Sequence, residues 1–301
     1  MKVLVTGSTG FVGSGIVRKL VEDGHQPVCL VRPGSEQKWK GNQDIRDRIV
    51  IASGDLFDQD SLMHAMDGCE AVIHLVGIIR EQPGKGVTFP RMHVTGTKRV
   101  LDAAKQAGVR RIIHMSALGA RPGASSLYHQ TKYDAEQLVK ESGIPYTIFR
   151  PSVIFGPGDE FVNLLADIVR LPVTPMLGDG SYLLQPVSRQ TVSDVFSQAL
   201  TLEEATNQLY EAGGPHPLSY AQILDAIGAA LGKQRVNKVK IPLGLMKPII
   251  HLMEGFTFFP ITRTQLTMLL EGNTCEDTER LYRVFHTEKI PFAEGIKAYI
   301  R

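Results

Sequence analysis

Short apolar runs alternate with segments of helical periodicity through the first half of the chain. The runs predicted to be strands lie at residues 3–5, 26–31, 49–53, 71–75, 111–115 and 146–149. Residues 96–107 and 128–141 carry apolar side chains at helical spacing, and glycines end both segments. Strands that are apolar throughout are typical of a sheet buried on both faces. The pattern predicts an α/β fold with a Rossmann-type, doubly wound parallel sheet.

The pattern changes after about residue 155. A Gly-Pro-Gly sequence at residues 156–158 precedes a predicted helix near 161–170, and the Pro/Gly-rich residues 172–180 are predicted to be a loop. A helix over 192–202 and a strand over 208–212 follow, and the chain is mostly helical from residue 219. We therefore expect a dinucleotide-binding domain over 1–155 and a smaller, mostly helical substrate-side lobe over 156–301. Parts of 187–212 are expected to return to the main sheet.

A glycine-rich turn links the first predicted strand to the first predicted helix. Gly7 permits a tight turn, Gly10 lets the backbone approach a pyrophosphate, and Gly13 lets the helix pack against the strand. The N–H groups and the positive end of the helix then face the phosphate charge. The spacing GxxGxxG in this position predicts a dinucleotide site, and an ordinary glycine-rich turn is the alternative.

The end of the second predicted strand bears on which dinucleotide is bound. It lacks the acidic residue that accepts from the ribose of NAD, and it ends at Arg32, whose planar fork suits the 2′-phosphate of NADP. Lys38 and Lys40 lie nearby in the sequence. The prediction favours NADP(H), with NAD(H) possible and a solvated basic loop as the alternative. Asp55, just past the third strand, is placed to contact adenine, unless it is a plain turn or cap residue.

Tyr128 and Lys132 form a YxxxK pair that carries the candidate chemistry. Residues i and i+4 share one helix face, so the phenol and the ammonium group can act together. A nearby ammonium group is expected to lower the pKa of the phenol. Such a tyrosine can exchange a proton with a carbonyl or alcohol oxygen while hydride moves to or from nicotinamide. Ser116 could hydrogen-bond the same oxygen. Alternatively, Tyr128 is a half-buried residue on the helix face and Lys132 is solvated.

Charge, cysteine content and hydropathy limit which partners and which compartment are expected. The formal net charge is +2 and the excess positive charges form no run, so we expect no nucleic-acid partner. Cys29, Cys69 and Cys275 lie far apart without metal or disulfide spacing, which favours a reducing cytosol. The first strand begins near residue 3, so no signal peptide is expected. No apolar run reaches the roughly 20 residues that span a bilayer. These features predict a cytoplasmic protein, with a peripheral position on the inner face of the membrane as the alternative.

Several motifs together resemble the short-chain dehydrogenase/reductase superfamily, in its extended and atypical branch. They lie at residues 6–13, 54–56, 71–77, 94–97, 116–120 and 150–159, with Tyr128 and Lys132. Residues 185–187, 211–215 and 264–270 are similar to bacterial proteins that resemble the nucleotide-binding accessory subunit of respiratory complex I. The resemblance implies bound NAD(P)(H) and a catalytic triad of Ser116, Tyr128 and Lys132. It also implies that Tyr128, Lys132, the three glycines of the turn, Arg32 and Asp55 contact the dinucleotide. Further contacts are implied for Thr6, Thr9, Phe11, Val12, Leu56, Leu75, Val76, Gly77, Met115, Pro151 and Val153.

The sequence departs from the family pattern at two places. Many relatives carry Asn at the position of His93, and in enzymes that Asn supports a water and proton path. Where the family often reads Val-x-Val-x-Asp-Val, this chain has Val-Ser-Arg-Gln-Thr-Val-Ser-Asp-Val at residues 187–195, which is not a clean copy of the pattern. Accessory-subunit relatives also retain the triad in a structural role. We expect an oxidoreductase acting on a small carbonyl or alcohol compound. One alternative is a non-catalytic accessory or sensor protein that holds NADP(H) and docks onto a larger assembly such as a respiratory complex. The other is a nucleotide-sugar epimerase or dehydratase.

Two histidines, one apolar segment and one loop have both structural and functional interpretations. His74 and His114, on predicted strands, are expected to be satisfied core or crevice histidines. Residues 243–256 predict an apolar helix that faces a core or an oligomer, or else contacts a membrane or a quinone-like ligand, and Phe258, Phe259 and Ile261 extend it. Residues 80–86 are predicted to be a flexible loop near the nicotinamide, either a lid or a solvated turn.

Overall fold

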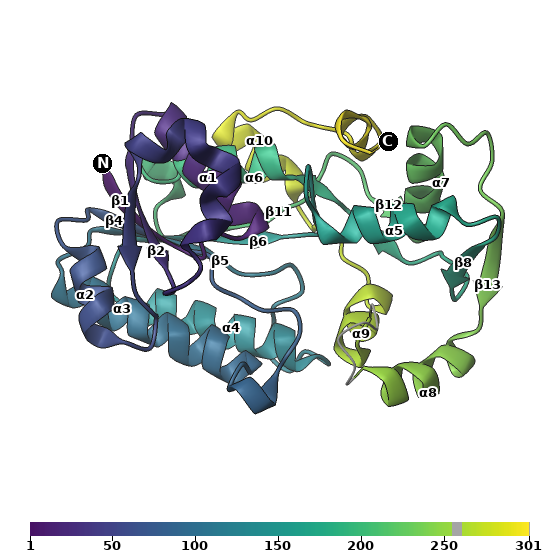
Figure 1. Cartoon of the computed structure of the whole chain (residues 1–301), viewed down its shortest axis with the longest axis horizontal. Helices are drawn as coiled ribbons and strands as arrows, with labels where there is room; N and C mark the ends of the chain where they lie inside the picture. Colours follow the sequence, from purple (N-terminus) through teal and green to yellow (C-terminus); the bar gives the residue numbers. More distant parts are fainter. Residues whose placement is uncertain (255–260, 301) are drawn as a thin grey trace.

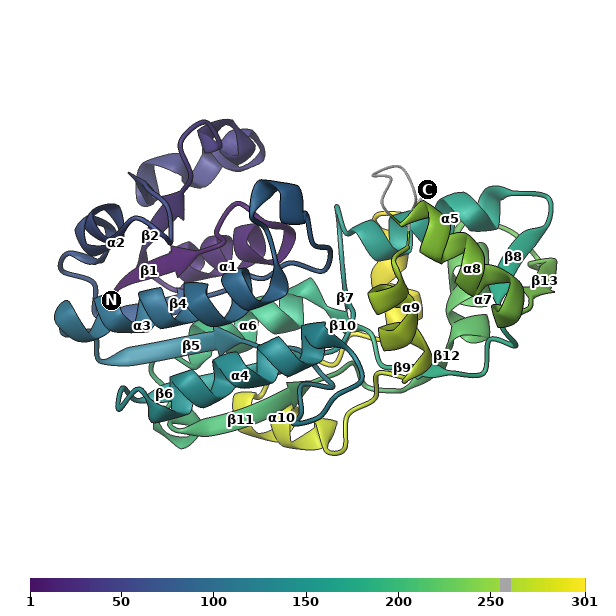
Figure 2. The ribbon, with the colours of Figure 1, turned by 90° about the horizontal axis from the view of Figure 1, so that it is seen from below.

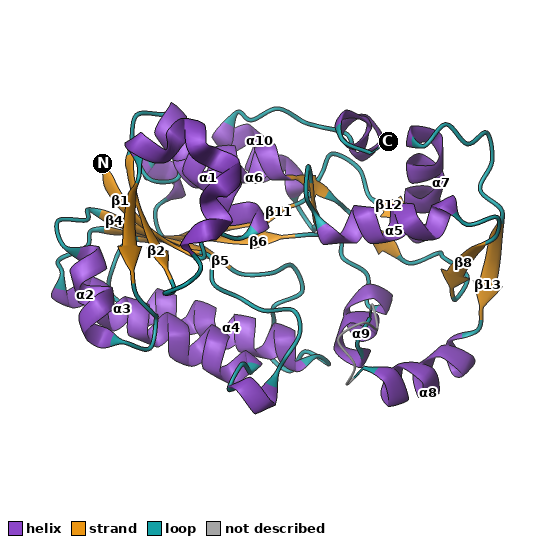
Figure 3. Ribbon diagram, in the orientation of Figure 1, coloured by secondary structure: helices purple, strands orange, loops and turns teal. Residues whose placement is uncertain are grey.

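A seven-stranded parallel sheet forms the centre of the computed structural model, which describes residues 1–254 and 261–300 apart from the side chains at 38–43, 245, 247, 249 and 251. The strand order is β11-β6-β5-β4-β1-β2-β3. Figures 1 and 3 show this sheet between two layers of helices. The strands are β1 (Lys2–Thr6), β2 (Gln26–Val31), β3 (Val50–Ser53), β4 (Ala71–His74), β5 (Arg111–Met115), β6 (Tyr146–Pro151) and β11 (Gln208–Ala212). The predicted doubly wound Rossmann-type fold is confirmed.

Helices cover both faces of the sheet. One face carries α1 (Phe11–Glu22), α6 (Arg189–Gln198) and α10 (Thr278–Phe285), and the other carries α2 (Gln59–Met66), α3 (Gly96–Gln106) and α4 (Leu127–Glu141) (Figure 1). Alternate residues of each strand enter the two resulting cores. Val3 and Val5 pack under α1 and α6, whereas Leu4 packs under α2 and α3. Because β1 is buried on both faces, every residue of its apolar run has a place in a core.

The strand order reverses beside β1, which lies between β2 and β4. The chain leaves β1 toward β2 and β3 on one side and returns to β4 and β5 on the other. In such sheets the crevice outside the carboxyl ends of the strands at this point is the usual ligand site. The glycine-rich turn that follows β1 lies at this edge.

The second lobe is built from short elements. It contains the paired strands β7 (Ile154–Phe155) with β10 (Val187–Ser188), β8 (Thr174–Leu177) with β13 (Lys238–Ile241), and β9 (Leu183–Leu184) with β12 (Leu218–Ser219). Its helices are α5 (Glu160–Arg170), α7 (Tyr220–Ala230), α8 (Leu243–Met253), α9 (Arg263–Leu270) and α11 (Phe292–Gly295). Figure 2 shows this lobe beside the carboxyl end of the sheet. The prediction of a loop over 172–180 is wrong, because Thr174–Leu177 pairs with a strand about sixty residues later.

Residues after 187 return to the sheet as helix α6 and strand β11. Helix α6 begins at Arg189, earlier than predicted, because the Ser188 side chain accepts a hydrogen bond from the Thr191 N–H. Helix α10, near the end of the chain, packs on the same face through Leu281 and Phe285. The domain boundary at residue 155 stays a prediction.

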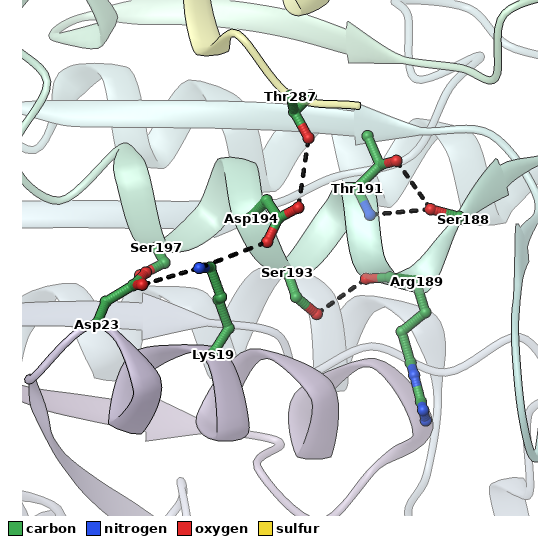
Figure 4. A network of polar contacts seen from close by, with 9 residues as sticks. All are labelled: Lys19, Asp23, Ser188, Arg189, Thr191, Ser193, Asp194, Ser197 and Thr287. Atoms are coloured by element: carbon green, nitrogen blue, oxygen red, sulfur yellow. Dashed lines mark hydrogen bonds and ion pairs between the residues drawn. The ribbon is translucent and has the colours of Figure 1, made fainter. Parts of the chain in front are cut away.

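A polar network fixes α6 against α1 at the rim of this core (Figure 4). The Ser197 Oγ donates to the Asp23 carboxylate at 2.6 Å, and the Lys19 Nζ donates to the same carboxylate at 2.8 Å. The Lys19 Nζ also lies 3.8 Å from the Asp194 carboxylate, which accepts a hydrogen bond from Thr287. The network thus connects three segments that are far apart in the sequence.

The glycine turn after β1 leaves no room for side chains. Gly7 has φ +73°, and a Cβ on Gly13 would lie 2.2 Å from the Gly7 carbonyl oxygen. Real Cβ atoms do not approach an oxygen so closely, so Gly13 allows α1 to pack directly on the turn. The predicted structural roles of Gly7 and Gly13 are confirmed.

Replacing Gly13 by Ala should therefore displace α1 from the turn. We expect Gly13→Ala to lower the free energy of unfolding by about 1–3 kcal/mol, because the added methyl overpacks against backbone. Gly244→Ala in α8 is the matched control, since a Cβ there meets no atom within 4 Å. Urea titration of both variants is the measurement. Equal stability of the two variants would contradict the predicted contact.

Candidate active site

The N-terminus of α1 is arranged to receive an anion. Gly10 precedes the helix, no side chain caps its first N–H groups, and its first turn contains no acidic residue. Uncapped helix N–H groups and the positive end of the helix dipole attract negative charge. The close packing of Gly13 on Gly7 brings the start of α1 directly against the backbone of the turn. These residues fit the pyrophosphate of a dinucleotide.

The other residues implied in dinucleotide binding gather at the same edge, because the carboxyl ends of parallel strands lie together. Thr6, Met115 and Pro151 end β1, β5 and β6. Thr9, Phe11 and Val12 belong to the turn and the start of α1, Leu75, Val76 and Gly77 follow β4, and Val153 follows β6. The Thr6 hydroxyl is buried and hydrogen-bonded to His74 at 2.7 Å, so only its backbone faces the crevice. Direct contact of these residues with a dinucleotide stays a prediction.

The side chains predicted to contact the adenosine half of the dinucleotide differ in the contacts that they already make within the protein. Arg32 follows β2, is exposed, and makes no ion pair within the described residues. The Asp55 carboxylate accepts a hydrogen bond from the Phe57 N–H at 2.9 Å, so it already stabilises its own turn. Leu56 is buried beside it. Adenine contact by Asp55 stays a prediction, whereas the side chains of Lys38 and Lys40 lie outside the described residues.

Helix α4 places Tyr128 and Lys132 at this edge. The helix begins after Ser126, whose side chain accepts from the His129 N–H. The Tyr128 ring packs edge-on against Phe89 and His93, with centroids 5.7 and 5.4 Å away. Lys132 is buried, and its Nζ donates to the Met115 carbonyl oxygen at 2.5 Å. The alternative of a solvated Lys132 is therefore wrong.

The expected effect of Lys132 on Tyr128 needs correction. Burial raises the pKa of Tyr128 to about 12, in place of the lowering that the sequence suggested. Burial also lowers the pKa of Lys132 to about 8, against the opposing effect of Glu136. The reason is desolvation, which penalises both the phenolate and the ammonium group. The ammonium group is hydrogen-bonded to Met115, and at neutral pH Tyr128 keeps its proton.

Ser116 takes part in a network that the sequence did not reveal. The Ser116 Oγ donates to the Glu136 carboxylate at 2.5 Å, and Arg150 donates two hydrogen bonds of 2.7 Å to the same carboxylate. Glu136 is 0% exposed. Because the hydroxyl hydrogen of Ser116 is engaged, its oxygen can take part in a further hydrogen bond as an acceptor only. The available signal was the i, i+4, i+8 spacing of Tyr128, Lys132 and Glu136 on one helix face.

His93 joins the loop after β4 to helix α4. It lies in the short π-helix η3 (Pro90–Thr95), and its Nε2 accepts from the Ile78 N–H at 3.1 Å. Its Nδ1 therefore carries the hydrogen and donates to the Thr131 Oγ1 at 2.9 Å. Burial, with a smaller contribution from Lys132, lowers the pKa of His93 to about 3. Both ring nitrogens are occupied, so His93 holds two segments in place and has no free nitrogen for a proton relay.

His74 on β4 and His114 on β5 differ in their hydrogen bonding. His74 is hydrogen-bonded to Thr6 and, through Nε2 at 3.0 Å, to Thr97, as expected for a satisfied core histidine. His114 stacks on His74 with ring centroids 5.5 Å apart. Both of its ring nitrogens are buried without a hydrogen-bond partner in the described part of the chain. The expectation of a satisfied His114 is wrong, because its partners on the two neighbouring strands are the apolar Ile148 and His74, whose ring stacks on it.

The loop after β4 and helix α8 are connected. Arg80 in this loop donates to the carbonyl oxygen of Glu254, which follows α8, at 2.5 Å. The loop contains the turn η2 (Pro83–Lys85) and is mostly exposed. Its role as a lid stays a prediction. Leu252 of α8 is 75% exposed, whereas Ile250 is buried. The predicted apolar residues Phe256, Phe258 and Phe259 lie outside the described residues.

Comparison with known proteins agrees with this geometry. The NAD(P)H-binding family matches residues 7–201, which is well over half of the chain. The chain therefore belongs to the NAD(P)H-binding family. Its fold and its relatives are those of oxidoreductases similar to short-chain dehydrogenases/reductases.

Three relatives illustrate the range. The mitochondrial NADH-ubiquinone oxidoreductase 40 kDa subunit of Neurospora crassa is 26% identical over 85% of this chain and 67% of its own length. Ceramide reductase of Caulobacter vibrioides is 34% identical over 60% of this chain and 55% of its own. The 2-alkyl-3-oxoalkanoate reductase of Stenotrophomonas maltophilia is 29% identical over 79% and 78%. The chain thus matches little more than half of ceramide reductase.

A solved structure supports the fold alone. The UDP-glucose 4-epimerase of Thermotoga maritima, with UDP-glucose, is similar with a TM-score of 0.77, over 100% of this chain and 97% of that chain. Its sequence identity is 19%. Among the helices of the described residues, none has the length and apolar character needed to cross a membrane.

The buried neutral histidines predict how stability depends on pH. The folded pKa values of His74 and His93 are about 3, whereas a histidine in an unfolded chain has a pKa of about 6.5. Between these values the unfolded chain binds more protons, so stability should fall as pH falls from about 6.5 toward 3. We expect His93→Leu to make this fall shallower, because it removes one such group.

The measurement is urea unfolding at about pH 7.5 and about pH 5. At the higher pH, His93→Leu should cost about 1–3 kcal/mol, because the Ile78 N–H loses its buried acceptor. The exposed His64, replaced by Leu, serves as the control and should leave both values nearly unchanged. An unaltered pH dependence in His93→Leu would show that His93 is not held neutral.

Proposed function

We propose that this chain is an NADP(H)-dependent oxidoreductase that reduces a carbonyl group to an alcohol, with Tyr128 as the proton donor. One observation carries the proposal. Lys132, one helical turn after Tyr128, donates a hydrogen bond to the carbonyl oxygen of Met115. Met115 directly precedes Ser116 in the sequence. This hydrogen bond supports a common site for the three side chains at the sheet edge that bears the glycine turn.

The protonation states of these residues favour reduction. A bound NADPH would supply the hydride. Tyr128, with its pKa raised to about 12, carries a proton at neutral pH and can give it to the oxygen as negative charge develops there. Lys132 is charged below its pKa of about 8, and a positive charge on the same helix face would favour the phenolate that forms during the reaction. Ser116 donates to Glu136, so its oxygen can accept from the Tyr128 hydroxyl or from the product alcohol.

An apolar, long-chain carbonyl compound is the substrate class that we propose. Two relatives are named as reductases of ceramide and of 2-alkyl-3-oxoalkanoate. In this chain Ile79, on the loop after β4, and Leu127, the first residue of α4, are 49% and 45% exposed. Exposed apolar side chains beside a catalytic group suit an apolar ligand.

The first test replaces the phenol hydroxyl. Tyr128→Phe should lower the rate of NADPH oxidation with a long-chain 3-oxo ester by about a hundredfold or more, since it removes the general acid. Tyr133→Phe, on the same helix, should keep the wild-type rate. The wild-type rate should also fall as pH rises through about 8, because Lys132 then loses its charge. The readout is absorbance of NADPH, and full activity of Tyr128→Phe would exclude the mechanism.

The second test concerns cofactor choice. Arg32 is exposed and free of ion pairs among the described residues, as a ligand for the 2′-phosphate should be. Arg32→Met should weaken NADPH binding by about tenfold or more, through loss of charge-assisted hydrogen bonds, and leave NADH binding unchanged. Arg110→Met, at the opposite edge of the sheet, is the control. Fluorescence titration gives the four affinities, and equal losses for both nucleotides would refute the assignment.

An accessory role is the second candidate. The engaged hydroxyl of Ser116 and the raised pKa of Tyr128 are compatible with a dinucleotide that is held and never turned over. The similarity to the 40 kDa subunit of NADH-ubiquinone oxidoreductase favours the same role. In that case, the exposed Leu252 of α8 would contact a larger assembly or a membrane surface from the cytoplasm. Copurified NADPH that resists exchange, and is oxidised by no carbonyl compound, would establish this candidate over the reductase.

A nucleotide-sugar epimerase is the third outcome of the same assay. It would be marked by tightly bound NAD⁺ and by conversion of UDP-glucose without net oxidation. The likeness to epimerases is one of fold alone.

A further inference from the structure

Arg189 approaches the glycine turn from an element that lies almost 180 residues later in the chain. It is the first residue of α6. Figure 4 shows its side chain extending from α6 toward the N-terminal end of α1. There the guanidinium carbon lies 5.0 Å from the centroid of the Phe11 ring. Phe11 is the first residue of α1, directly after Gly10.

A glycine inside α1 makes this approach possible. A Cβ on Gly15 would lie 3.1 Å from the Cδ and 3.2 Å from the Cγ of Arg189, and 2.9 Å from the Ser193 Oγ. Glycine inside a helix costs about 0.5–1 kcal/mol relative to alanine, so its presence calls for a reason. Gly15 lies outside the GxxGxxG set, and here it provides the path along which the Arg189 stem reaches the start of α1.

The guanidinium group of Arg189 is poorly matched by the protein itself. Its single hydrogen bond in the described chain goes to the Phe11 carbonyl oxygen at 3.4 Å. No carboxylate of the described residues lies within ion-pair distance of it. Burial and the charge of Arg18 lower the pKa of Arg189, against the smaller opposing effects of Asp159 and Tyr299. The Asp159 carboxylate is itself engaged, by the Gly156 and Val162 N–H groups and the Tyr299 hydroxyl.

Two positive features therefore meet without an anion between them. One is the uncapped, acid-free N-terminus of α1, and the other is the partly buried guanidinium group of Arg189. The two positive features repel each other, and a diphosphate placed between them would be attracted by both. An arginine whose five donors meet one long protein acceptor retains donors for such a ligand.

We propose that Arg189 is a binding residue for the pyrophosphate of the dinucleotide, acting from α6 together with the glycine turn. This inference rests on the dinucleotide binding of the family and is independent of the proposed reaction and of the preference for NADP(H). It assigns the pyrophosphate, common to NADH and NADPH, to Arg189, and leaves the 2′-phosphate to Arg32. The two arginines thus have separable effects on binding.

The test compares the two nucleotides in two arginine variants. Arg189→Met should weaken NADPH and NADH binding by the same factor, about tenfold to a hundredfold, because both carry the pyrophosphate. Arg189→Lys should recover part of the loss, since it keeps the charge and loses the fork. Arg280→Met is the matched control, because Arg280 also stacks on an aromatic ring, that of Tyr210 at 4.8 Å, away from the glycine turn. Arg280→Met should leave both affinities unchanged.

Fluorescence titration of each full-length variant with NADPH and with NADH provides the affinities, and thermal unfolding reports folding. Arg189→Gln, which retains part of the stem, replaces Arg189→Met if the latter does not fold. Unchanged affinities in a folded Arg189 variant would overturn the proposal, and so would a loss confined to NADPH. Failure of the reductase assay leaves this titration unaffected, so the two proposals fail separately.

Discussion

The contact between Gly13 and the Gly7 carbonyl is the constraint on which the site depends. Because nothing larger than hydrogen fits between them, α1 starts directly above the end of β1 and presents its N–H groups to the crevice. The parallel sheet then brings the ends of β4, β5 and β6 to the same edge. The triad, the His93 bridge and Arg189 all take their positions from this geometry, although they come from four separate segments.

Desolvation sets the chemistry around that edge. Lys132 is buried among His74, His93 and His114, which all stay neutral because burial and the lysine charge lower their pKa values. The buried carboxylate of Glu136 is balanced by Arg150 and holds the Ser116 hydrogen. The site therefore combines a neutral phenol, a marginally charged lysine and an acceptor-only serine. This combination suits proton donation better than proton removal.

Apolar periodicity predicted the sheet well, because strands buried on both faces are continuous apolar runs. It failed for β8, whose residues form a strand only through pairing with β13, far along the chain. Among site residues, Tyr128, Lys132 and Ser116 came from local spacing and family resemblance. Glu136, Arg150 and Arg189 were missed as site residues, since their roles depend on contacts across elements. The raised pKa of Tyr128 was missed for the same reason, because desolvation is a property of the packed surroundings.

The sequence by itself determined the Rossmann-type fold, the glycine turn and the residue types available for hydride chemistry. These depend on short-range patterns: apolar runs, helix spacing and the absence of a Cβ at three positions. Only the tertiary structure decided the direction of each hydrogen bond and the protonation state of each buried group. It also brought Arg189 of α6 beside Phe11 of α1. Those properties arise from contacts between distant segments and from the exclusion of water. A local stretch of residues determines neither the contacts nor the exclusion of water.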